Sequence, residues 1–259
     1  MKIWRRYGMK SLILCDGAEP ERVSPLCEKY NAGVEIQNFD PNVNYNKNEL
    51  TGLYKSVFPQ NREKYMHAPF WDLCPGSRSV KIAEATRYYF DYAYEIAEEL
   101  GCSGVIVHHG YVPHTSLPDG WKKRSVIFWN DFFSAHTGGI NIFMENHLDR
   151  TADIIGDVVD MCQNCRLAVN LDIGHAHCIS DMTVADWIKQ LNKRIRYVHL
   201  HQNYGVSDEH LGLKKGDIPI KEVLDGLNEY APDAVWALEC NLDDMEDSIL
   251  FLKENGYIK

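Results

Sequence analysis

Residues 167–177 read LAVNLDIGHAH, a short apolar run that ends in Asp172 and is followed three residues later by His175. Five other short apolar runs also end in a side chain that can bind a divalent metal. These side chains are His67, His108, Glu145, His199 and Glu239. The six runs recur at intervals of about 30 to 40 residues, the length of one strand plus one crossover helix. We therefore expect all six positions to lie at the same end of successive parallel strands.

Apolar runs rich in β-branched residues alternate with stretches of helical period along the chain. The expected strands are residues 11–15, 33–38, 64–68, 104–108, 140–145, 167–172, 195–200 and 234–239. The expected helices lie around residues 21–30, 49–58, 80–100, 121–134, 151–162, 183–192, 220–230 and 245–255. This alternation predicts an α/β fold, a single (β/α)8 TIM barrel that occupies residues 1–259 as one domain.

The helix expected at residues 80–100 has the clearest pattern, with Gly101 as its stop. Its apolar stripe consists of Ile82, Ala85, Tyr89, Ala93, Ile96 and Leu100. Three long irregular segments, 69–79, 110–120 and 201–219, follow the third, fourth and seventh strands. These segments are βα loops, which carry the substrate contacts in barrels of this kind.

The composition is that of a soluble globular enzyme, with 45% hydrophobic, 25% charged and 11% aromatic residues. No apolar run approaches the roughly 20 residues that cross a bilayer, and the start, Met1 to Arg6, opens no signal peptide. We expect a cytoplasmic protein with no membrane role. The formal net charge of −10 argues mildly against nucleic acid as the main partner.

The eight cysteines are scattered and lack the secretory context of a disulfide framework, so we expect them to be reduced. Cys162 and Cys165 form a CxxC motif at the end of a helical stretch. Because no second Cys or His pair stands at zinc-finger spacing, small semi-buried side chains are favoured there over a zinc or redox site.

Glu145, Asp172, His199 and Glu239 offer three carboxylates and one imidazole, a donor set that suits Mn²⁺, Zn²⁺ or Mg²⁺. A metal chelated by a substrate carbonyl and the neighbouring hydroxyl would act as a Lewis acid and stabilise an enediolate. Glu145 and Glu239 come from opposite sides of the predicted ring of strands. They are therefore the expected base and acid for proton transfer. Each follows an apolar run, and a buried carboxylate is costly unless it is paired or metal-bound.

Further candidates extend this site. His67 and His108 end two strands, while Asp208 and His210 form an Asp-x-His pair in the loop at 201–219. For these four residues, metal ligation and hydrogen bonding to substrate or to ligands are both open. Together with His175 they bring the metal-binding side chains to nine, enough for two or three ions. Such a cluster suits displacement at phosphorus.

The strand-end segments resemble those of the xylose isomerase-like TIM-barrel superfamily. This superfamily includes sugar phosphate isomerases and epimerases and the apurinic endonuclease type 2 family. The resemblance covers most of the chain from about Gly33 onward. Its segments are HAPFWDLCPGS (67–77), VIVHHGY (105–111), FMEN (143–146), LDIGHAH (171–177), HLHQNYGVSDEHLGLKKGDI (199–218) and ALEC (237–240).

The two branches imply different chemistry. In the epimerase branch, the resemblance implies that Glu145, Asp172, His199 and Glu239 bind one metal, that the two glutamates exchange protons with substrate, and that His175 contacts substrate oxygens. In the endonuclease branch, it implies that all nine residues hold three zinc ions.

The chain departs from both patterns. The endonucleases typically continue their Glu-Asn with Thr-Ala-Gly and their seventh-strand His with Leu-Asn-Asp, whereas this chain has ENHL at 145–148 and HLHQ at 199–202. Against the isomerase-like pattern His-Leu-His-Asp-Asn, Gln202 replaces the Asp. Lys214 stands where a Gly is common. These departures leave the substrate open, not the fold.

Several other polar residues have an ordinary structural interpretation. Core or loop positions without a ligand role are expected for His109, His114, His136, His147 and His177. His201 is open, because it follows the ligand candidate His199 on the alternating strand face. Glu35 is either a hydrogen-bond partner of the site or a plain barrel-interior carboxylate.

Loop side chains could recognise the substrate. Phe70, Trp71, Tyr111 and Trp121 either stack on a sugar or pack the loops, with packing favoured. Lys214 and Lys215 either receive a substrate phosphate or remain solvated.

We predict a metal-dependent isomerase or epimerase that acts on a sugar or sugar phosphate through an enediolate, with one to three ions of Zn²⁺, Mn²⁺ or Mg²⁺ as cofactor. The alternative is a zinc-cluster phosphodiesterase that resembles the apurinic-site endonucleases. A barrel that has lost catalysis and only binds a ligand is less favoured, because the set of acids is intact. The expected partner is a small sugar, with no nucleic acid, and a homo-oligomer is left open.

Overall fold

Eight parallel strands form a closed barrel in the order of the chain, β1 to β8. The computed structural model describes residues 11–40 and 46–259, so the interpretation of Met1 to Arg6 lies outside the described residues. The strands are β1 Leu12–Cys15, β2 Gly33–Ile36, β3 Lys64–His67, β4 Gly104–His108, β5 Asn141–Glu145, β6 Leu167–Asp172, β7 Ile195–Leu200 and β8 Val235–Leu238. The predicted (β/α)8 TIM barrel is confirmed.

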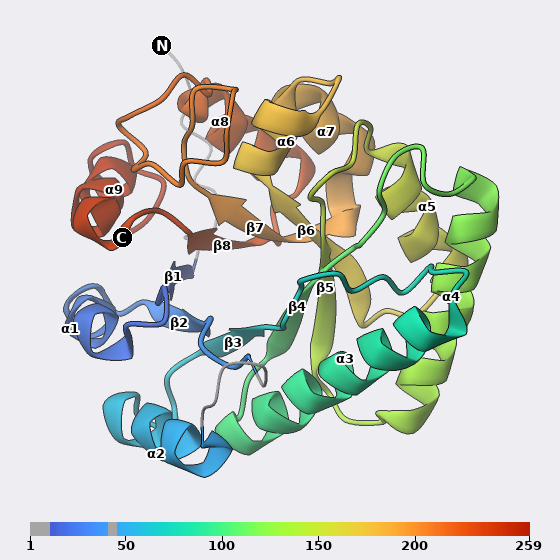
Figure 1. The fold of residues 1–259 in the computed structure, drawn as a ribbon. Helices are drawn as coiled ribbons and strands as arrows, with labels where there is room; N and C mark the ends of the chain where they lie inside the picture. The colour runs from blue at the N-terminus through green and yellow to red at the C-terminus, as the bar shows by residue number, and fades with distance from the viewer. Residues whose placement is uncertain (1–10, 41–45) are drawn as a thin grey trace.

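The helices form a ring outside the barrel, as Figure 1 shows. They are α1 Pro20–Tyr30, α2 Lys47–Val57, α3 Val80–Leu100, α4 Pro118–Ala135, α5 Asp153–Cys162, α6 Ile173–Ile179, α7 Val184–Leu191, α8 Ile220–Tyr230 and α9 Leu242–Glu254, with a short 3₁₀ helix at Asn192–Arg194. Helix α6 and the 3₁₀ helix were not expected. The one-domain assignment for residues 1–259 stays a prediction.

Alternation along the strands places the candidate ligands inside the barrel. One interior layer consists of Ile13, Cys15, Tyr65, Ile106, Phe143, Ala168, Tyr197 and Ala237. Successive strand side chains point to opposite faces, so a residue two positions further on points inward again. Two positions after Tyr65, Phe143 and Ala237 stand His67, Glu145 and Glu239. These three candidate ligands therefore lie in the next layer, at the C-terminal mouth.

Gly104, at the start of β4, makes room for this apolar layer. A Cβ atom on Gly104 would lie 2.4 Å from Phe143 Cε2 and 3.2 Å from Tyr65 Cδ1. Tyr65 and Phe143 also contact Tyr197, with ring centroids 4.8 and 5.2 Å apart. The absence of a side chain at Gly104 therefore allows three aromatic rings to fill the barrel below the mouth.

The buried face of α3 differs from the predicted stripe. Ile82 is 42% exposed and Ala85 is exposed, whereas Thr86 and Phe90 are buried. The second half agrees with the prediction, and Gly101 ends the helix with φ 71°. In the first turns of α3, Ile82 lines a surface pocket together with Trp71.

The described residues contain no helix long and apolar enough to cross a membrane, and the cytoplasmic location stays a prediction. All eight cysteines are free thiols. Cys162 is buried and Cys165 is exposed. Neither belongs to any group of side chains that could hold a metal within residues 11–40 and 46–259.

Asp16, directly after β1, is buried with no exposed surface. It accepts hydrogen bonds from the backbone N–H groups of Ala18 (2.9 Å) and Gln37 (3.1 Å) and from the Tyr54 hydroxyl (2.5 Å). Burial outweighs these bonds and raises the pKa of Asp16 from 3.8 to about 6. The folded protein therefore holds the proton on Asp16 more tightly than the unfolded chain does.

This pKa predicts a pH-dependent stability. The stability contributed by neutral Asp16 is complete below about pH 4 and is lost as the pH rises through about 6. Relative to wild type, Asp16→Asn should therefore gain on the order of 2–3 kcal/mol in free energy of unfolding between about pH 4 and 7. Urea unfolding of the metal-free proteins across that range measures the difference. A difference that stays constant with pH would contradict the prediction.

Candidate active site and metal centre

The strand register brings the candidate ligands side by side at the mouth. His108 on β4 pairs with Glu145 on β5, and Asp172 on β6 pairs with His199 on β7. His199 also pairs with Ala237 on β8, two residues before Glu239. Parallel pairing at one end of the barrel thus places residues that are far apart in sequence within one site.

Glu145 is the centre of this site and is 1% exposed. Its Oε1 lies 3.4 Å from His108 Nε2 and 3.3 Å from His175 Nδ1. Its Oε2 lies 3.4 Å from His67 Nε2 and 3.3 Å from His199 Nδ1. One carboxylate therefore faces imidazoles from four different elements.

His199 Nδ1 lies close to the other two carboxylates of the predicted metal site. It lies 2.9 Å from Glu239 Oε2 and 3.6 Å from Asp172 Oδ2, in addition to its approach to Glu145. Glu239 Oε2 is buried and makes no hydrogen bond to any described residue, even though it is this close to the ring nitrogen. The Glu239 oxygen and the His199 nitrogen therefore approach each other without the geometry of a hydrogen bond.

The spacing and chemistry of these atoms fit a divalent cation. Ligand atoms about 2.0–2.1 Å from a tetrahedral Zn²⁺ lie roughly 3.3 Å from one another, which is close to the distances around Glu145 and His199. An orphaned carboxylate oxygen aimed at an imidazole nitrogen is also typical of a place where a metal belongs. Within the described residues, His67, His108 and Glu145 form one group that could hold an ion, and Glu145, Asp172 and His175 form another.

Opposing charges control protonation in this pocket. Burial opposes the ionisation of Glu145, but the imidazoles of His199 and His108 hold its pKa well below its usual range. Burial would lower the pKa of His199, yet the carboxylates of Glu239 and Glu35 raise it well above the ordinary value. The acids thus require a positive charge among them, supplied by a proton or by a metal ion.

A second group of donors lies beside the first. Asp208 Oδ2 is 3.2 Å from His175 Nε2 and 2.7 Å from His210 Nε2. Because His175 also faces Glu145 through Nδ1, it connects the two groups. All nine predicted side chains thus come together in one contact network, although their individual roles stay a prediction.

Helix α6 explains how His175 reaches the mouth. Asp172 is its N-cap, and the Asp172 side chain accepts a hydrogen bond of 2.6 Å from the His175 N–H. The chain turns directly from β6 into α6, which directs His175 back over the barrel. A Cβ on Gly174 would lie 2.0 Å from His201 Cε1, so only glycine fits at this turn.

The loop between β7 and α8 carries Asp208 and His210. An isolated antiparallel bridge joins Gln202 to Leu211, with backbone hydrogen bonds of 2.9 and 2.8 Å. The Gln202 side chain also bonds the backbone of Ile218 in both directions, at 3.0 and 2.9 Å. Gln202 therefore folds the loop back over the mouth.

The candidate ligands open into a pocket of about 470 Å³. Phe70 and Trp71 line it, and Phe70 stacks on His108 with ring centroids 4.3 Å apart. Trp71 is 72% exposed at the rim. Tyr111 and Trp121 are buried and pack edge to face, so loop packing is the correct interpretation for these two residues.

His147 differs from the expectation of an ordinary loop histidine. It lines the pocket, and its ring centroid lies 4.9 Å from that of His108 and 4.8 Å from that of His175. Its position in the short turn after β5 left no periodic pattern to detect. By contrast, His136 bonds the Phe132 carbonyl oxygen at 3.0 Å as a helix-end residue.

Three further histidines have structural surroundings. His177 contacts Asn203 Oδ1 at 2.7 Å. His109 is buried next to Trp121, 4.5 Å between ring centroids, and faces Asp149 at 3.4 Å. His114 lines a separate surface pocket with a positive φ of 66°. None of the three lines the pocket above the ligands.

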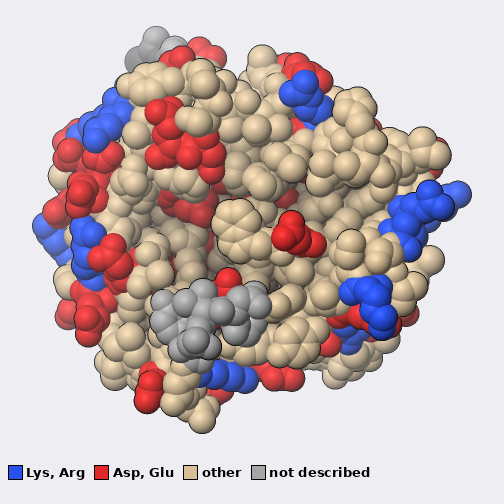
Figure 2. All heavy atoms as spheres, viewed as in Figure 1, with Lys and Arg blue, Asp and Glu red and all other residues tan. Residues whose placement is uncertain are grey.

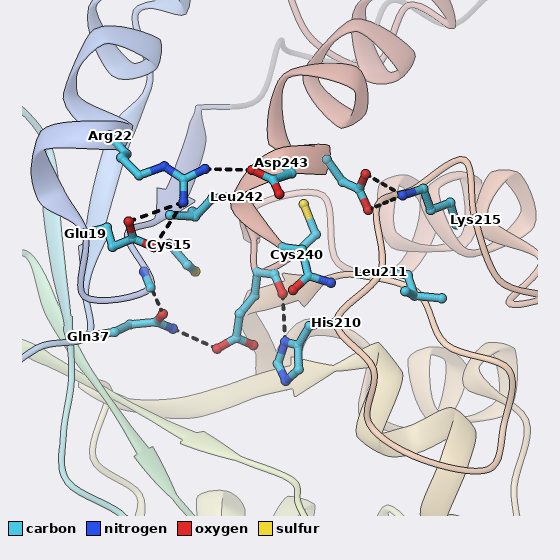
Figure 3. A pocket seen from close by; sticks show the side chains of 14 residues that line it. Cys15, Glu19, Arg22, Gln37, His210, Leu211, Lys215, Cys240, Leu242 and Asp243 are labelled. Carbon is cyan, nitrogen blue, oxygen red and sulfur yellow. Dashed lines mark hydrogen bonds and ion pairs between the residues drawn. The ribbon is translucent and has the colours of Figure 1, made fainter.

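A second pocket of about 540 Å³ adjoins the site and shares Gln37, His210 and Glu239 with the first. In Figure 3, Gln37 and His210 point into it from different elements, and Arg22 and Lys215 stand on its outer wall. Acids already neutralise these cations, because Arg22 pairs with Asp243 at 2.7 Å and Lys215 pairs with Asp244 at 2.5 Å. Lys214 lies outside this wall, 4.0 Å from Asp247.

The face that carries the candidate ligands is acidic around the mouth of the barrel. Figure 2 shows acidic side chains in the central hollow and most lysines and arginines toward the edges of the face. This distribution agrees with the net charge of −10. A polyanion would meet repulsion from this face unless bound cations reversed the charge.

The profile of the family described as "Xylose isomerase-like TIM barrel" matches residues 24–255. The chain belongs to this family. The match covers the strands and loops that form the site, from β2 to α9.

Two sequence relatives of this chain have different descriptions. "Uncharacterized protein MJ1311" of Methanocaldococcus jannaschii is 33% identical over 274 residues, which cover 96% of this chain and 88% of the relative. "Probable endonuclease 4" of Mycobacterium ulcerans is 28% identical over 207 residues, which cover 73% of this chain and 77% of the relative.

Solved structures with the xylose isomerase-like fold match over nearly the whole chain. The TTHB071 protein from Thermus thermophilus, soaked with ZnCl₂, has a TM-score of 0.77 at 22% identity and covers 95% of this chain and 97% of its own. A D-tagatose 3-epimerase-like protein has a TM-score of 0.74 at 26% identity, with 95% and 96% covered. A D-psicose 3-epimerase studied with D-fructose has a TM-score of 0.74 at 18% identity, with 95% and 99% covered.

Proposed function

We propose that this protein is a metal-dependent isomerase or epimerase of a sugar or sugar phosphate. The observation that carries the proposal is the convergence of Glu145 and Glu239, from β5 and β8, on one nitrogen of His199. These two strands lie on different sides of the closed barrel. Two carboxylates that approach one point from different sides suit the removal of a proton and its return at another position.

Different residues of the site would bind the metal, transfer protons and contact the substrate. A divalent metal would be held by Glu145, Asp172, His199 and Glu239, and it would supply the Lewis acidity that makes a proton next to a substrate carbonyl easier to remove. One of the two glutamates takes that proton, and the other returns one. His175 and His147 line the same pocket, where their rings would contact the substrate. Phe70 and Trp71 form an aromatic wall for the carbon skeleton.

The size and charge of the pocket favour a small, oxygen-rich substrate. A volume of about 470 Å³ is in the range of small-molecule sites. The acidic surroundings do not favour a long polyanion. The D-tagatose 3-epimerase-like protein, at 26% identity, supports the same class of reaction.

Hydrogen exchange tests this proposal. The metal-loaded protein, incubated in D₂O with a panel of ketoses and ketose phosphates, is expected to replace one carbon-bound hydrogen of its substrate with deuterium and to form the isomer or epimer. Proton NMR measures both events. Bound metal without exchange on any member of the panel would count against the proposal.

A zinc-cluster phosphodiesterase is the second candidate, because a specific observation favours it. His67, His108, Asp208 and His210 add two further donor groups around Glu145 and His175. Several cations bridged by shared ligands suit in-line displacement at phosphorus. The relative named "Probable endonuclease 4", at 28% identity over 207 residues, supports this second candidate.

Metal content and nicking of abasic DNA separate the two candidates. Two or three zinc ions per chain together with cleavage of an abasic duplex would favour the phosphodiesterase. One tightly bound ion with no cleavage would favour the isomerase or epimerase.

A further inference from the structure

Each of the four residues expected to share one metal has a polar partner on its other side. For His199 and Glu239, the partner contacts the ring nitrogen or the oxygen that does not face the common centre. For Glu145 and Asp172, the partner shares the oxygen that faces His199 Nδ1. The pairs are Glu145 with Asn170 (2.9 Å), Asp172 with His201 (3.0 Å), His199 with Glu35 (3.0 Å) and Glu239 with Gln37 (2.7 Å). Among the oxygens that face the centre, Glu239 Oε2 has no hydrogen bond to a described residue.

Glu35 is the only acid among these four partners, and it is completely buried. Its Oε2 lies 3.0 Å from His199 Nε2 and accepts a hydrogen bond of 2.8 Å from the Tyr197 hydroxyl. Its Oε1 accepts a hydrogen bond of 3.1 Å from Gln37 Nε2. These contacts hold the Glu35 carboxylate in one orientation against the imidazole.

The tautomer of His199 decides whether it can bind a metal. A neutral imidazole carries one proton, and only the other ring nitrogen has a lone pair to donate. A carboxylate at Nε2 favours the proton on that nitrogen, which leaves a lone pair on Nδ1. Asn170 Nδ2, at 3.2 Å, can donate to this Nδ1 and favours the same tautomer. Glu145, Asp172 and Glu239 also face Nδ1. A negative partner also makes the imidazole a stronger donor to a metal.

Gln37 connects this arrangement to Glu239. The same Nε2 group lies 3.1 Å from Glu35 Oε1 and 2.7 Å from Glu239 Oε1, so its two N–H bonds can serve both carboxylates. The Glu239 oxygen that Gln37 does not contact is Oε2, which faces His199. Gln37 therefore orients Glu239 in the way that Glu35 orients His199.

We propose that Glu35 and Gln37, at the C-terminal end of β2, are positioning residues for the metal: Glu35 holds His199 with Nδ1 free, and Gln37 turns Glu239 Oε2 toward the same point. The inference rests on the proposed metal-dependent function. β2 contributes no ligand in this arrangement, yet it orients the ligands of β7 and β8.

A competing arrangement would use Glu35 itself as a ligand. Cys15, Glu35, His199 and Glu239 also form a group close enough to hold an ion. In that arrangement His199 would present Nε2 to the metal, and the proton would move to Nδ1. The three carboxylates around Nδ1 would then face a protonated nitrogen in place of a cation. The geometry favours Glu35 as a partner of His199 over this alternative.

The test measures metal affinity in three variants. Glu35→Gln keeps the size of the side chain but removes the charge and allows an N–H group to face Nε2. Gln37→Leu removes the bonds to Glu239 and to Glu35 Oε1, and it leaves the charge of Glu35 and its contact with His199 unchanged. Cys15→Ser is the matched control, because Cys15 lies in the same wall and belongs to the competing group. Competition with a fluorescent chelator gives the Zn²⁺ dissociation constant, and the visible spectrum of the Co²⁺-loaded protein reports the ligand geometry.

We expect Glu35→Gln to weaken Zn²⁺ binding by about 10- to 100-fold, Gln37→Leu to weaken it by less, and Cys15→Ser to leave it unchanged. The Co²⁺ spectrum should change in the first two variants only. Circular dichroism of the metal-free proteins shows whether they are folded. If Glu35→Gln does not fold, the Gln37→Leu result decides the proposal.

The possible results distinguish a failure of the proposed function from a failure of the positioning role alone. A wild-type protein that binds no divalent metal would overturn the proposed function and this inference with it. Tight binding by wild type that is unchanged in Glu35→Gln and Gln37→Leu would overturn the inference alone. Weaker binding by Cys15→Ser, with a loss of thiolate absorption from the Co²⁺ protein, would establish the competing ligand set.

Discussion

A Glu145→Gln protein is expected to lose turnover by about 10³-fold or more and to bind less metal than wild type. Glu145 faces four imidazoles at 3.3–3.4 Å, including His199 and His108. The amide that replaces the carboxylate has no negative charge for a cation and cannot take a proton. It would also turn an N–H group toward at least one of these rings.

Metal content by mass spectrometry and turnover by the D₂O assay measure the two effects. Glu63→Gln is the matched control, because Glu63 precedes β3 at the opposite end of the barrel and bonds the Tyr65 hydroxyl at 2.9 Å. The control is expected to keep wild-type metal content and turnover. Wild-type turnover by Glu145→Gln would contradict the assignment of Glu145 to the site.

Glu239→Gln is expected to separate exchange from product formation. In the proposed reaction Glu145 removes one proton from the substrate, and Glu239 returns a proton at the other position. When Glu239 is an amide, fully metal-loaded protein should still exchange one substrate hydrogen with D₂O, whereas product formation falls by about 10²- to 10⁴-fold. The amide at residue 239 keeps an oxygen that can accept the hydrogen bond from Gln37. The side chain at 239 can therefore keep its position.

Proton NMR follows exchange and product in the same sample. Glu209→Gln is a suitable control, because Glu209 lies in the nearby loop and accepts a bond from the Tyr204 N–H at 2.9 Å. The control should behave like wild type. Product formation by Glu239→Gln at the wild-type rate would rule out a proton-transfer role for Glu239.

The strand ends could be predicted from the sequence because each depends on a local pattern. The observed strands start and end within two residues of the predicted ones. The strand-end ligands follow from the same alternation, since the period of two determines which side chains point inward. This is why His67, His108, Glu145 and Glu239 could be placed at one mouth before any contact was known.

Features that depend on contacts across the barrel could not be predicted in the same way. The roles of Glu35 and Gln37 depend on distances to β7 and β8, and His147 lines the pocket because of the turn after β5. Helix α6 had a weak local pattern, an Asp172 cap followed by only seven helical residues. The stripe on α3 was partly wrong, since Ile82 is exposed and the first turns bury Thr86 and Phe90.

The order of apolar runs and polar strand ends in the sequence was sufficient to determine the barrel, the family and the acids and imidazoles at its mouth. The tertiary structure alone decided which nitrogen of His199 faces those acids and which side chains hold it there. The reason is physical. Strand periodicity acts between neighbours in the chain, whereas the orientation of a ligand depends on partners from other strands that only the closed barrel brings within hydrogen-bond distance.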